Sequence, residues 1–258
     1  MQFIRDRVLK GEVMFGIGAF LGSGLTVEMI GAAGFDWTWI DCEHGAQDFS
    51  ELIHQMQANS IYRAPAVVRI AWNEAPRFKR VLDLGAAGIM VPYVNTAEEA
   101  ELAAEAMRYP PNGIRGVAKF NRACGFGQNF SDYFSKANEN LLTVVQVETR
   151  KSVENADEIA SVNGVDVLFI GPLDLSVSLG VADNYEHPEF LESMDRVAEA
   201  CKRHGKAAGI LVPRLDYLES WIAKGFTFLV VGSDGGCVAN GLKNIAAVCG
   251  KHKKKEAS

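Results

Sequence analysis

Acidic side chains and one histidine directly follow apolar runs at three places in the sequence. An apolar run that ends abruptly in polar residues is typical of a buried parallel strand whose C-terminal end opens into a site. The polar residues are Asp41, Glu43 and His44 after the first run, Gln146 and Glu148 at the end of the second, and Asp174 after the third. These residue types can bind a metal ion or move a proton, so we ask whether they meet.

Glu148 and Asp174 follow neighbouring runs, so their carboxylates can lie close together. Two close carboxylates repel, and one takes up a proton unless a cation relieves them. Hard divalent cations are held by carboxylates together with water and substrate oxygens, so this pair predicts a Mg2+ or Mn2+ site. The alternative is that each carboxylate pairs with an arginine or caps a helix.

His44 and Arg69 add a candidate base and a candidate cation. An imidazole titrates near neutral pH and suits proton abstraction, although His44 could instead be a hydrogen-bonded surface residue. Arg69, at the exit of a short apolar run, could bind a carboxylate or stabilise an enolate oxygen, or serve only as an ion-pair partner. A base, a cation and a metal in one pocket indicate proton or carbon–carbon chemistry beside a carbonyl.

Schiff-base chemistry is the competing route, and it needs a lysine inside the site. No lysine stands at the C-terminal end of a predicted strand. Lys206 precedes a strand and therefore lies at the wrong end, while Lys119 in the long glycine-rich stretch 109–131 stays open. The pattern therefore favours a metal-dependent route.

Eight apolar runs alternate with helical patterns and predict the elements that position these residues. The predicted strands are residues 13–18, 36–41, 66–69, 88–92, 142–148, 165–170, 207–212 and 226–231. The predicted helices are residues 1–11, 26–33, 48–58, 73–84, 96–107, 152–160, 189–204, 214–223 and 235–248. Eight strand–helix units in a chain of this length predict a single-domain (β/α)8 TIM barrel over residues 1–250. The C-terminal strand ends of such a barrel share one face, and active sites form there.

Composition narrows the class of protein further. The 258 residues are 48% hydrophobic, with a formal net charge of −6 and a pI of about 5.5, which argues against a nucleic-acid partner. Five scattered cysteines without a C-x-x-C motif fit a reducing, cytoplasmic compartment. No apolar run reaches the roughly 18 residues of a membrane span, so no membrane partner is expected. The basic cluster in residues 251–258 is interpreted as a solvated tail.

Five stretches together resemble the HpcH/HpaI family of metal-dependent (class II) pyruvate aldolases. This family includes 4-hydroxy-2-oxoheptanedioate aldolase and 2-keto-3-deoxy-sugar-acid aldolases. The stretches are GFDWTWIDCEH (34–44), VVR with WN (67–69 and 72–73), RYPPNGIRG (108–116), VQVETR (145–150) and FIGPLDLS (169–176). The resemblance implies reversible cleavage of a 4-hydroxy-2-oxo acid to pyruvate and an aldehyde through a metal-stabilised enolate.

The resemblance also implies how the site holds metal and substrate. Glu148 and Asp174 would ligate a divalent cation, Mg2+ or Mn2+, with Co2+ or Zn2+ as alternatives. The 2-oxo acid end of the substrate would bind that cation beside Gln146 and Asp174. The backbone around Gly171 and Leu173 would hold the substrate carboxylate.

For the proton steps, the resemblance implies that Arg69 stabilises the enolate oxygen and His44 is the acid–base residue. Asp83, contributed by a neighbouring subunit, would support His44. The implied assembly is a homohexamer in which the last helix of one barrel packs on another.

The sequence departs from the family where the aldehyde would bind. Residues 16–19 read Gly-Ile-Gly-Ala where many members carry a tryptophan, and Leu173 stands where relatives often have alanine. These changes leave open an oxaloacetate decarboxylase or a macrophomate-synthase-like lyase on the same core. A non-catalytic sensor of 2-oxo acids is a further alternative from a different class of protein.

Overall fold

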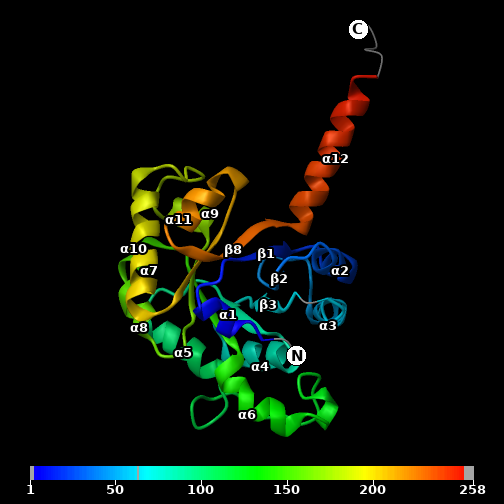
Figure 1. Cartoon of the computed structure of the whole chain (residues 1–258), viewed down its shortest axis with the longest axis vertical. Coiled ribbons are helices and arrows are strands. Elements are labelled where there is room, and N and C mark those ends of the chain that lie inside the picture. The colour runs from blue at the N-terminus through cyan, green and yellow to red at the C-terminus, as the bar shows by residue number, and fades with distance from the viewer. Residues whose placement is uncertain (1–2, 63, 253–258) are drawn as a thin grey trace.

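Eight parallel strands close into a barrel in sequence order, with β1 pairing with both β2 and β8 (Figure 1). The computed structural model describes residues 3–62 and 64–252. The strands are β1 (Met14–Ala19), β2 (Trp37–Asp41), β3 (Ala66–Arg69), β4 (Gly88–Val91), β5 (Leu142–Val147), β6 (Val167–Ile170), β7 (Ala207–Leu211) and β8 (Phe226–Ser233). The predicted (β/α)8 barrel is therefore confirmed.

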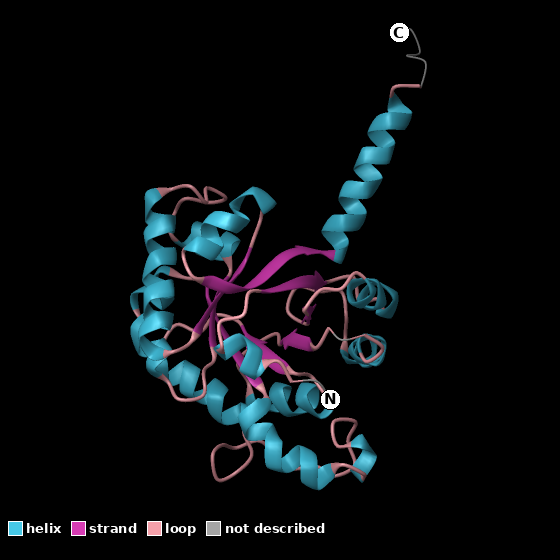
Figure 2. Ribbon diagram, in the orientation of Figure 1, coloured by secondary structure: helices cyan, strands magenta, loops and turns pink. Residues whose placement is uncertain are grey.

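Helices connect successive strands and surround the barrel (Figure 2). They are α1 (Arg5–Leu9), α2 (Gly24–Ala32), α3 (Phe49–Asn59), α4 (Ala75–Asp83), α5 (Ala97–Met107), α6 (Phe130–Asn140), α7 (Arg150–Glu154), α8 (Ala156–Ser161), α9 (Pro172–Ser178), α10 (Pro188–His204), α11 (Leu218–Ala223) and α12 (Asp234–Gly250). Two short 3-10 turns, Gly125–Gly127 and Leu215–Tyr217, complete the set.

Three helical features differ from the prediction. Helices α6 and α9 were not predicted, and α6 begins at Phe130, within the last residues of the glycine-rich stretch 109–131. The single helix predicted over 152–160 is two helices, because Asn155 leaves the helical conformation between α7 and α8. The predicted tail at 251–258 falls outside the described residues from position 253 onward.

The strands are apolar on both faces because each face packs against a different part of the core. One cluster, which includes Trp37, Trp39, Phe169 and Phe228, takes alternate residues of the strands. Residues that alternate with these, such as Ile40, join a larger cluster shared with the helices. Since side chains alternate along a strand, the first cluster fills the barrel and the second lies between the barrel and its helices.

The N-terminal end of the barrel is closed by α1. Ile4 and Val8 belong to the interior cluster, and the Nε of Arg5 donates to Oδ1 of Asp166 at 2.9 Å. The other oxygen of this buried carboxylate accepts from the backbone N of Thr143. The closed end leaves the opposite, C-terminal end of the barrel for a site.

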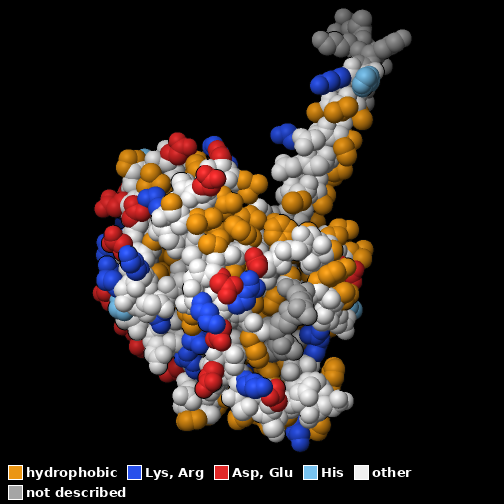
Figure 3. Space-filling view, in the orientation of Figure 1, with side chains coloured by type: hydrophobic (Ala, Val, Ile, Leu, Met, Phe, Trp, Pro, Cys, Tyr) orange, Lys and Arg blue, Asp and Glu red, His pale blue; other side chains and the backbone are white. Residues whose placement is uncertain are grey.

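Helix α12 projects away from the barrel (Figures 1 and 3). Asp234 is its one buried residue. Four large apolar side chains along the helix are 49–63% exposed: Val238, Leu242, Ile245 and Val248. Within the described part of the chain, no helix combines the length and hydrophobicity that crossing a membrane requires.

Candidate active site

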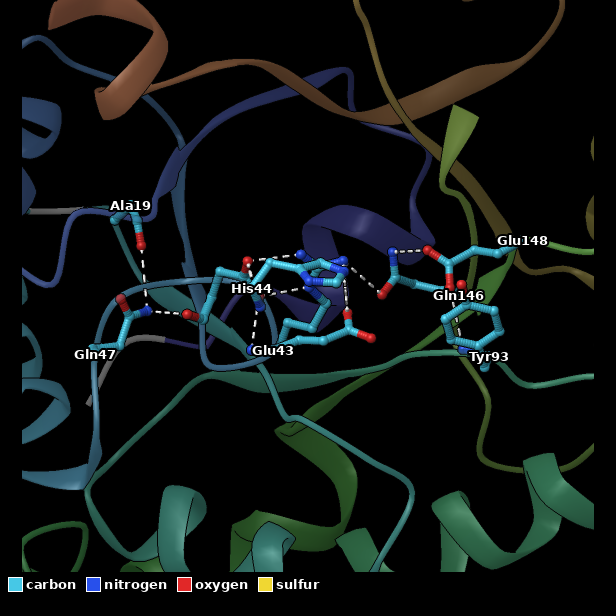
Figure 4. A network of polar contacts seen from close by, with 9 residues as sticks. Ala19, Glu43, His44, Gln47, Tyr93, Gln146 and Glu148 are labelled. Carbon is cyan, nitrogen blue, oxygen red and sulfur yellow. Dashed lines mark hydrogen bonds and ion pairs between the residues drawn. The ribbon is translucent and has the colours of Figure 1, made fainter. Parts of the chain in front are cut away.

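The predicted polar residues lie on the C-terminal face of the barrel. Asp41 and Arg69 are the last residues of β2 and β3 and are paired in register. Gln146 lies at the end of β5, and Glu148 follows that strand. In Figure 4, one network of polar contacts extends from His44 to Glu148.

Arg69 is the centre of this network. Its Nε and Nη2 each donate to one oxygen of the fully buried Asp41 at 2.7 Å. Its Nη1 lies 2.9 Å from Oε2 of Glu43 and 3.5 Å from Oε1 of Gln146. The guanidinium also lies over the Trp39 ring, with its carbon 4.5 Å from the ring centroid. Burial is the largest single effect on the pKa of Arg69 and lowers it, but the hydrogen bonds that Arg69 donates to Asp41, together with the charges of nearby carboxylates, raise the pKa of the guanidinium overall.

Asp41 also fixes the turn that carries the histidine. Its two oxygens accept from the backbone N of Glu43 at 3.1 Å and of His44 at 3.3 Å. The His44 side chain is 69% exposed, and its Nε2 lies 4.0 Å from Oε2 of Glu43. A fixed backbone with an exposed imidazole leaves His44 free to meet a substrate.

Glu148 is the buried carboxylate of the site. It is 2% exposed, and its Oε1 accepts from Nε2 of Gln146 at 2.7 Å. The pKa of Glu148 is raised to about 8, mainly by burial; the charge of Arg69 and the hydrogen bond from the backbone of Tyr93 lower it, and the nearby carboxylates of Asp174 and Glu43 raise it. A Cβ on Gly171 would lie 2.3 Å from Oε1 of Glu148, so the backbone here approaches the carboxylate as only a glycine allows.

Tyr93 connects Asp174 to the rest of the network. The backbone N of Tyr93 donates to Oε2 of Glu148, and its phenol donates to Oδ1 of Asp174, each at 3.2 Å. Asp174 lies in the first turn of α9, next to Leu173, whose side chain is 54% exposed. Tyr93, two residues after the end of β4, was not among the predicted site residues.

Asp83 does not join these residues within one chain. It ends α4, and a helix that returns antiparallel to its strand ends at the opposite face of the barrel. Its Oδ1 accepts from Nη2 of Arg115 at 2.8 Å, and Arg115 in turn donates to the Tyr133 hydroxyl. The prediction that Asp83 reaches the His44 of a neighbouring subunit stays a prediction.

The donor set fits a hard divalent cation with few protein ligands. Among residues 3–62 and 64–252, no group of three or more His, Cys, Asp or Glu side chains is arranged to hold a metal ion. Mg2+ commonly uses one or two carboxylates and takes its other oxygens from water and substrate. Glu148 and Asp174, beside the close backbone approach at Gly171, match that pattern. A bound cation would also offset the mutual repulsion of the carboxylates.

Comparisons with known proteins agree with this fold and show the family of the chain. The model of the HpcH/HpaI aldolase/citrate lyase family matches residues 20–241. The chain is 39% identical over 235 residues to the 5-keto-4-deoxy-D-glucarate aldolase of Escherichia coli K12, covering 91% of each chain. A crystal structure of a family protein from Burkholderia cenocepacia J2315 superposes with a TM-score of 0.90 at 32% identity, covering 95% of this chain and 98% of that one. Macrophomate synthase superposes with a TM-score of 0.81 at 27% identity, covering 98% and 92%. The chain therefore belongs to the HpcH/HpaI aldolase/citrate lyase family.

Proposed function

We propose that this protein is a divalent-metal-dependent aldolase that reversibly cleaves a 4-hydroxy-2-oxo acid into pyruvate and an aldehyde. The observation that carries the proposal is the buried Glu148, which is joined through Gln146 to Arg69 and through Tyr93 to Asp174. Together with the exposed His44, this network supplies a cation site, a partner for a developing oxyanion and a base. The family membership of the chain supports the same reaction class.

The substrate class we propose is a 2-keto-3-deoxy sugar acid. The relative from E. coli is named for 5-keto-4-deoxy-D-glucarate. This compound is a diacid, so numbering it from its other carboxyl end makes it a 2-keto-3-deoxy acid. Its keto acid end is the part that becomes pyruvate, and its hydroxylated end becomes the aldehyde.

Glu148 and Asp174 are the proposed ligands of the cation, with Mg2+ or Mn2+ favoured by the all-oxygen donor set. When bound there, the cation would withdraw electron density from the 2-oxo group of the substrate. Gln146 orients Glu148 by donating to its Oε1. The backbone from Gly171 to Leu173 holds the substrate carboxylate.

Cleavage needs a base that removes a proton from the 4-hydroxyl and a group that accepts negative charge on the 2-oxo oxygen. His44 takes the proton from the 4-hydroxyl, and the C3–C4 bond breaks so that C4 leaves as the aldehyde. The electron pair of that bond moves toward C3 and the 2-oxo oxygen, which gives the enolate of pyruvate. The Nη1 of Arg69, which lies 3.5 Å from Oε1 of Gln146, would stabilise the negative charge on this oxygen. The proton that His44 took up then returns to C3 and forms the methyl group of pyruvate, so His44 ends in its starting state.

The proposed assembly is a homohexamer, and the projecting α12 supports it. Its exposed apolar residues, such as Leu242 and Ile245, would be buried when α12 packs on a neighbouring barrel. In that assembly, Asp83 of one chain supports His44 of another and holds its imidazole in the orientation for proton transfer. The Arg115–Asp83 ion pair holds the carboxylate at the surface of the barrel, where its side chain is 22% exposed.

A second candidate function is that of a lyase that decarboxylates oxaloacetate, either alone or followed by a macrophomate-synthase-like step that forms a carbon–carbon bond. It is favoured by the structural similarity to macrophomate synthase at a TM-score of 0.81. The two functions differ in what leaves C3 of the keto acid, an aldehyde or carbon dioxide. Rates of carbon dioxide release from oxaloacetate and of pyruvate release from a 2-keto-3-deoxy sugar acid, measured on one preparation, separate them.

The variant Glu148→Gln tests the proposed metal site. It keeps the size of the side chain but removes its charge and replaces one of the two accepting oxygens by a donating amide. We expect pyruvate formation from a 2-keto-3-deoxy sugar acid to fall by more than about 100-fold, because even residues that only orient metal ligands cost 10–100-fold. Isothermal titration with Mg2+ or Mn2+ should show a matching loss of binding.

The control is Glu186→Gln, which alters an exposed carboxylate that accepts from Tyr217 outside the site. This variant should retain both metal binding and turnover. Pyruvate formation that continues in wild-type protein after EDTA treatment would contradict the metal-dependent mechanism.

A further inference from the structure

Tyr93 occupies an unusual position at the exit of β4. Its φ angle is 51°, in the left-handed region that residues with a Cβ rarely adopt. A hydrogen bond within the β4–α5 loop holds this turn, since Nδ2 of Asn95 donates to the Tyr93 carbonyl at 2.8 Å. The backbone N of Asn95 in turn donates to Oε2 of Glu99, in the first turn of α5, at 2.6 Å. Strained backbone that is held in this way marks a position where the conformation is needed.

The conformation allows one residue to contact two carboxylates from different strand–helix units. The amide of Tyr93 reaches Glu148, which follows β5, and its phenol reaches Asp174, which follows β6. The two bonds leave from opposite ends of one residue, so the tyrosine spans the space between the carboxylates. The Tyr93 ring also lies 6.3 Å from the Trp72 ring, which limits its movement on the solvent side.

We propose that Tyr93 is a positioning residue that sets the spacing of the two carboxylates for a divalent cation. This inference rests on the metal site of the proposed function. Two carboxylates repel and would separate if nothing held them. A neutral donor fixed to the backbone opposes that separation without neutralising either charge. Because the phenol uses only Oδ1 of Asp174, the other oxygen stays available to the cation.

Tyr93 would act before any substrate binds. Carboxylates that are already held in the binding geometry bind a cation more tightly, because they lose less conformational entropy when the cation binds. The hydroxyl of Tyr93 therefore contributes to metal affinity and not to the chemical steps. At saturating metal, a protein without this hydroxyl should recover its turnover.

The test is isothermal titration calorimetry. Metal-free wild-type protein and metal-free Tyr93→Phe are each titrated with Mn2+. The phenylalanine keeps the ring and the backbone amide and removes only the hydroxyl. We expect the Kd for Mn2+ to rise about 10-fold, the lower end of the range for residues that orient metal ligands. The midpoint of thermal unfolding of the metal-free protein should be the same for wild type and variant. If the hydroxyl had only a structural role, its removal would lower this midpoint.

Two further variants make the result specific. Tyr217→Phe removes a phenol that also donates to a carboxylate, at 3.0 Å to Glu186, and it should leave the Kd unchanged. Tyr93→Asn removes the whole ring but suits a left-handed backbone, so it should fold and lose affinity at least as much as Tyr93→Phe. Raising the Mn2+ concentration should restore the turnover of Tyr93→Phe.

The outcomes separate this inference from the proposed function. If wild type binds Mn2+ and Tyr93→Phe binds it equally well, Tyr93 does not position the carboxylates and the inference is wrong, while the proposed metal site stands. If wild-type protein binds no divalent cation, both fail together. A weaker Kd in Tyr93→Phe that high Mn2+ does not rescue would also contradict a positioning role.

Discussion

At the scale of single residues, Arg69 determines how the site is held together. It is 6% exposed and donates to both oxygens of Asp41, which is itself inaccessible to solvent. Breaking a buried ion pair is costly because the remaining charge loses its partner. The geometry here is also specific to arginine, whose planar fork can donate to both oxygens of a carboxylate at once.

Arg69→Lys should therefore destabilise the protein although it conserves the charge. We expect the free energy of unfolding in urea to fall by about 1–3 kcal/mol, the cost of leaving a buried acceptor without its donor. The matched control is Arg77→Lys in the exposed ion pair with Glu74, which should change stability by less than about 0.5 kcal/mol. Equal stabilities of the two variants would contradict this account of Arg69.

Some residues of the site could be predicted from the sequence and others could not. Arg69, Glu148 and His44 could be selected because charged or titratable side chains at the end of an apolar run are unusual. Tyr93 could not, because a tyrosine after a strand is common. Its role depends on a left-handed φ angle and on Asp174, which is 81 residues away in sequence. Such long-range geometry leaves no local pattern.

At the scale of elements, the strands could be predicted and some helices could not. A strand buried on both faces leaves an apolar run such as residues 226–231, which β8 extends to Ser233. Helix α9 begins with Pro172 and includes Asp174 and serines, so its composition resembles a loop. Helix α6 begins at the end of a glycine-rich stretch. Only two of its side chains are buried, those of Tyr133 and Ala137. Short or mostly exposed helices carry too little periodicity to be recognised.

The packing of β1 against β2 gives a prediction for a single methyl group. A Cβ on Gly16 would lie 2.4 Å from Cε2 of Trp37, and Trp37 stacks on Phe228 at 4.0 Å between ring centroids. Since Trp37 is fully buried, its ring has no free space into which to move. Gly16→Ala should lower the free energy of unfolding by about 1–3 kcal/mol, as overpacked cores do.

Gly241→Ala is the matched control for this substitution, and it should have the opposite sign. Gly241 lies in α12, and a Cβ there would meet nothing within 4 Å. Alanine favours a helix over glycine by about 1 kcal/mol, so stability should stay the same or rise. A Gly16→Ala protein as stable as the wild type in urea would show that the barrel interior adjusts around Trp37.

At the scale of the whole molecule, α12 distinguishes an isolated barrel from an assembly. Its 17 residues include one buried residue, and four large apolar side chains are exposed along it. The neighbouring surface of α2 also exposes Leu25 and Met29, which are spaced to share one helix face. The composition of residues 235–248 predicts a helix. It does not indicate whether this helix packs on its own barrel or on the barrel of a neighbouring subunit. The assembly could therefore be inferred only from the family resemblance.

Leu242→Glu should dissociate the proposed hexamer by placing a charge in the apolar contact. Light scattering after gel filtration should show wild type at six chain masses and the variant at a lower mass, with the barrel still folded by circular dichroism. Turnover should fall with dissociation, because His44 would lose the Asp83 of its neighbour. The control Lys243→Glu changes charge at the adjacent helix position and should keep the wild-type mass. A monomeric wild type, or an unchanged mass for Leu242→Glu, would contradict the proposed assembly.

The central claim is that this face of the barrel forms the enolate of pyruvate with the help of a divalent cation. Proton NMR can follow the methyl group of pyruvate in heavy water, with Mg2+, with EDTA, and with Glu148→Gln. This measurement needs no knowledge of the aldehyde. The account predicts that the methyl signal disappears by deuterium exchange in the presence of wild-type protein and Mg2+, and persists with EDTA or with the variant. A methyl signal that persists beside folded, Mg2+-loaded wild-type protein would contradict the account.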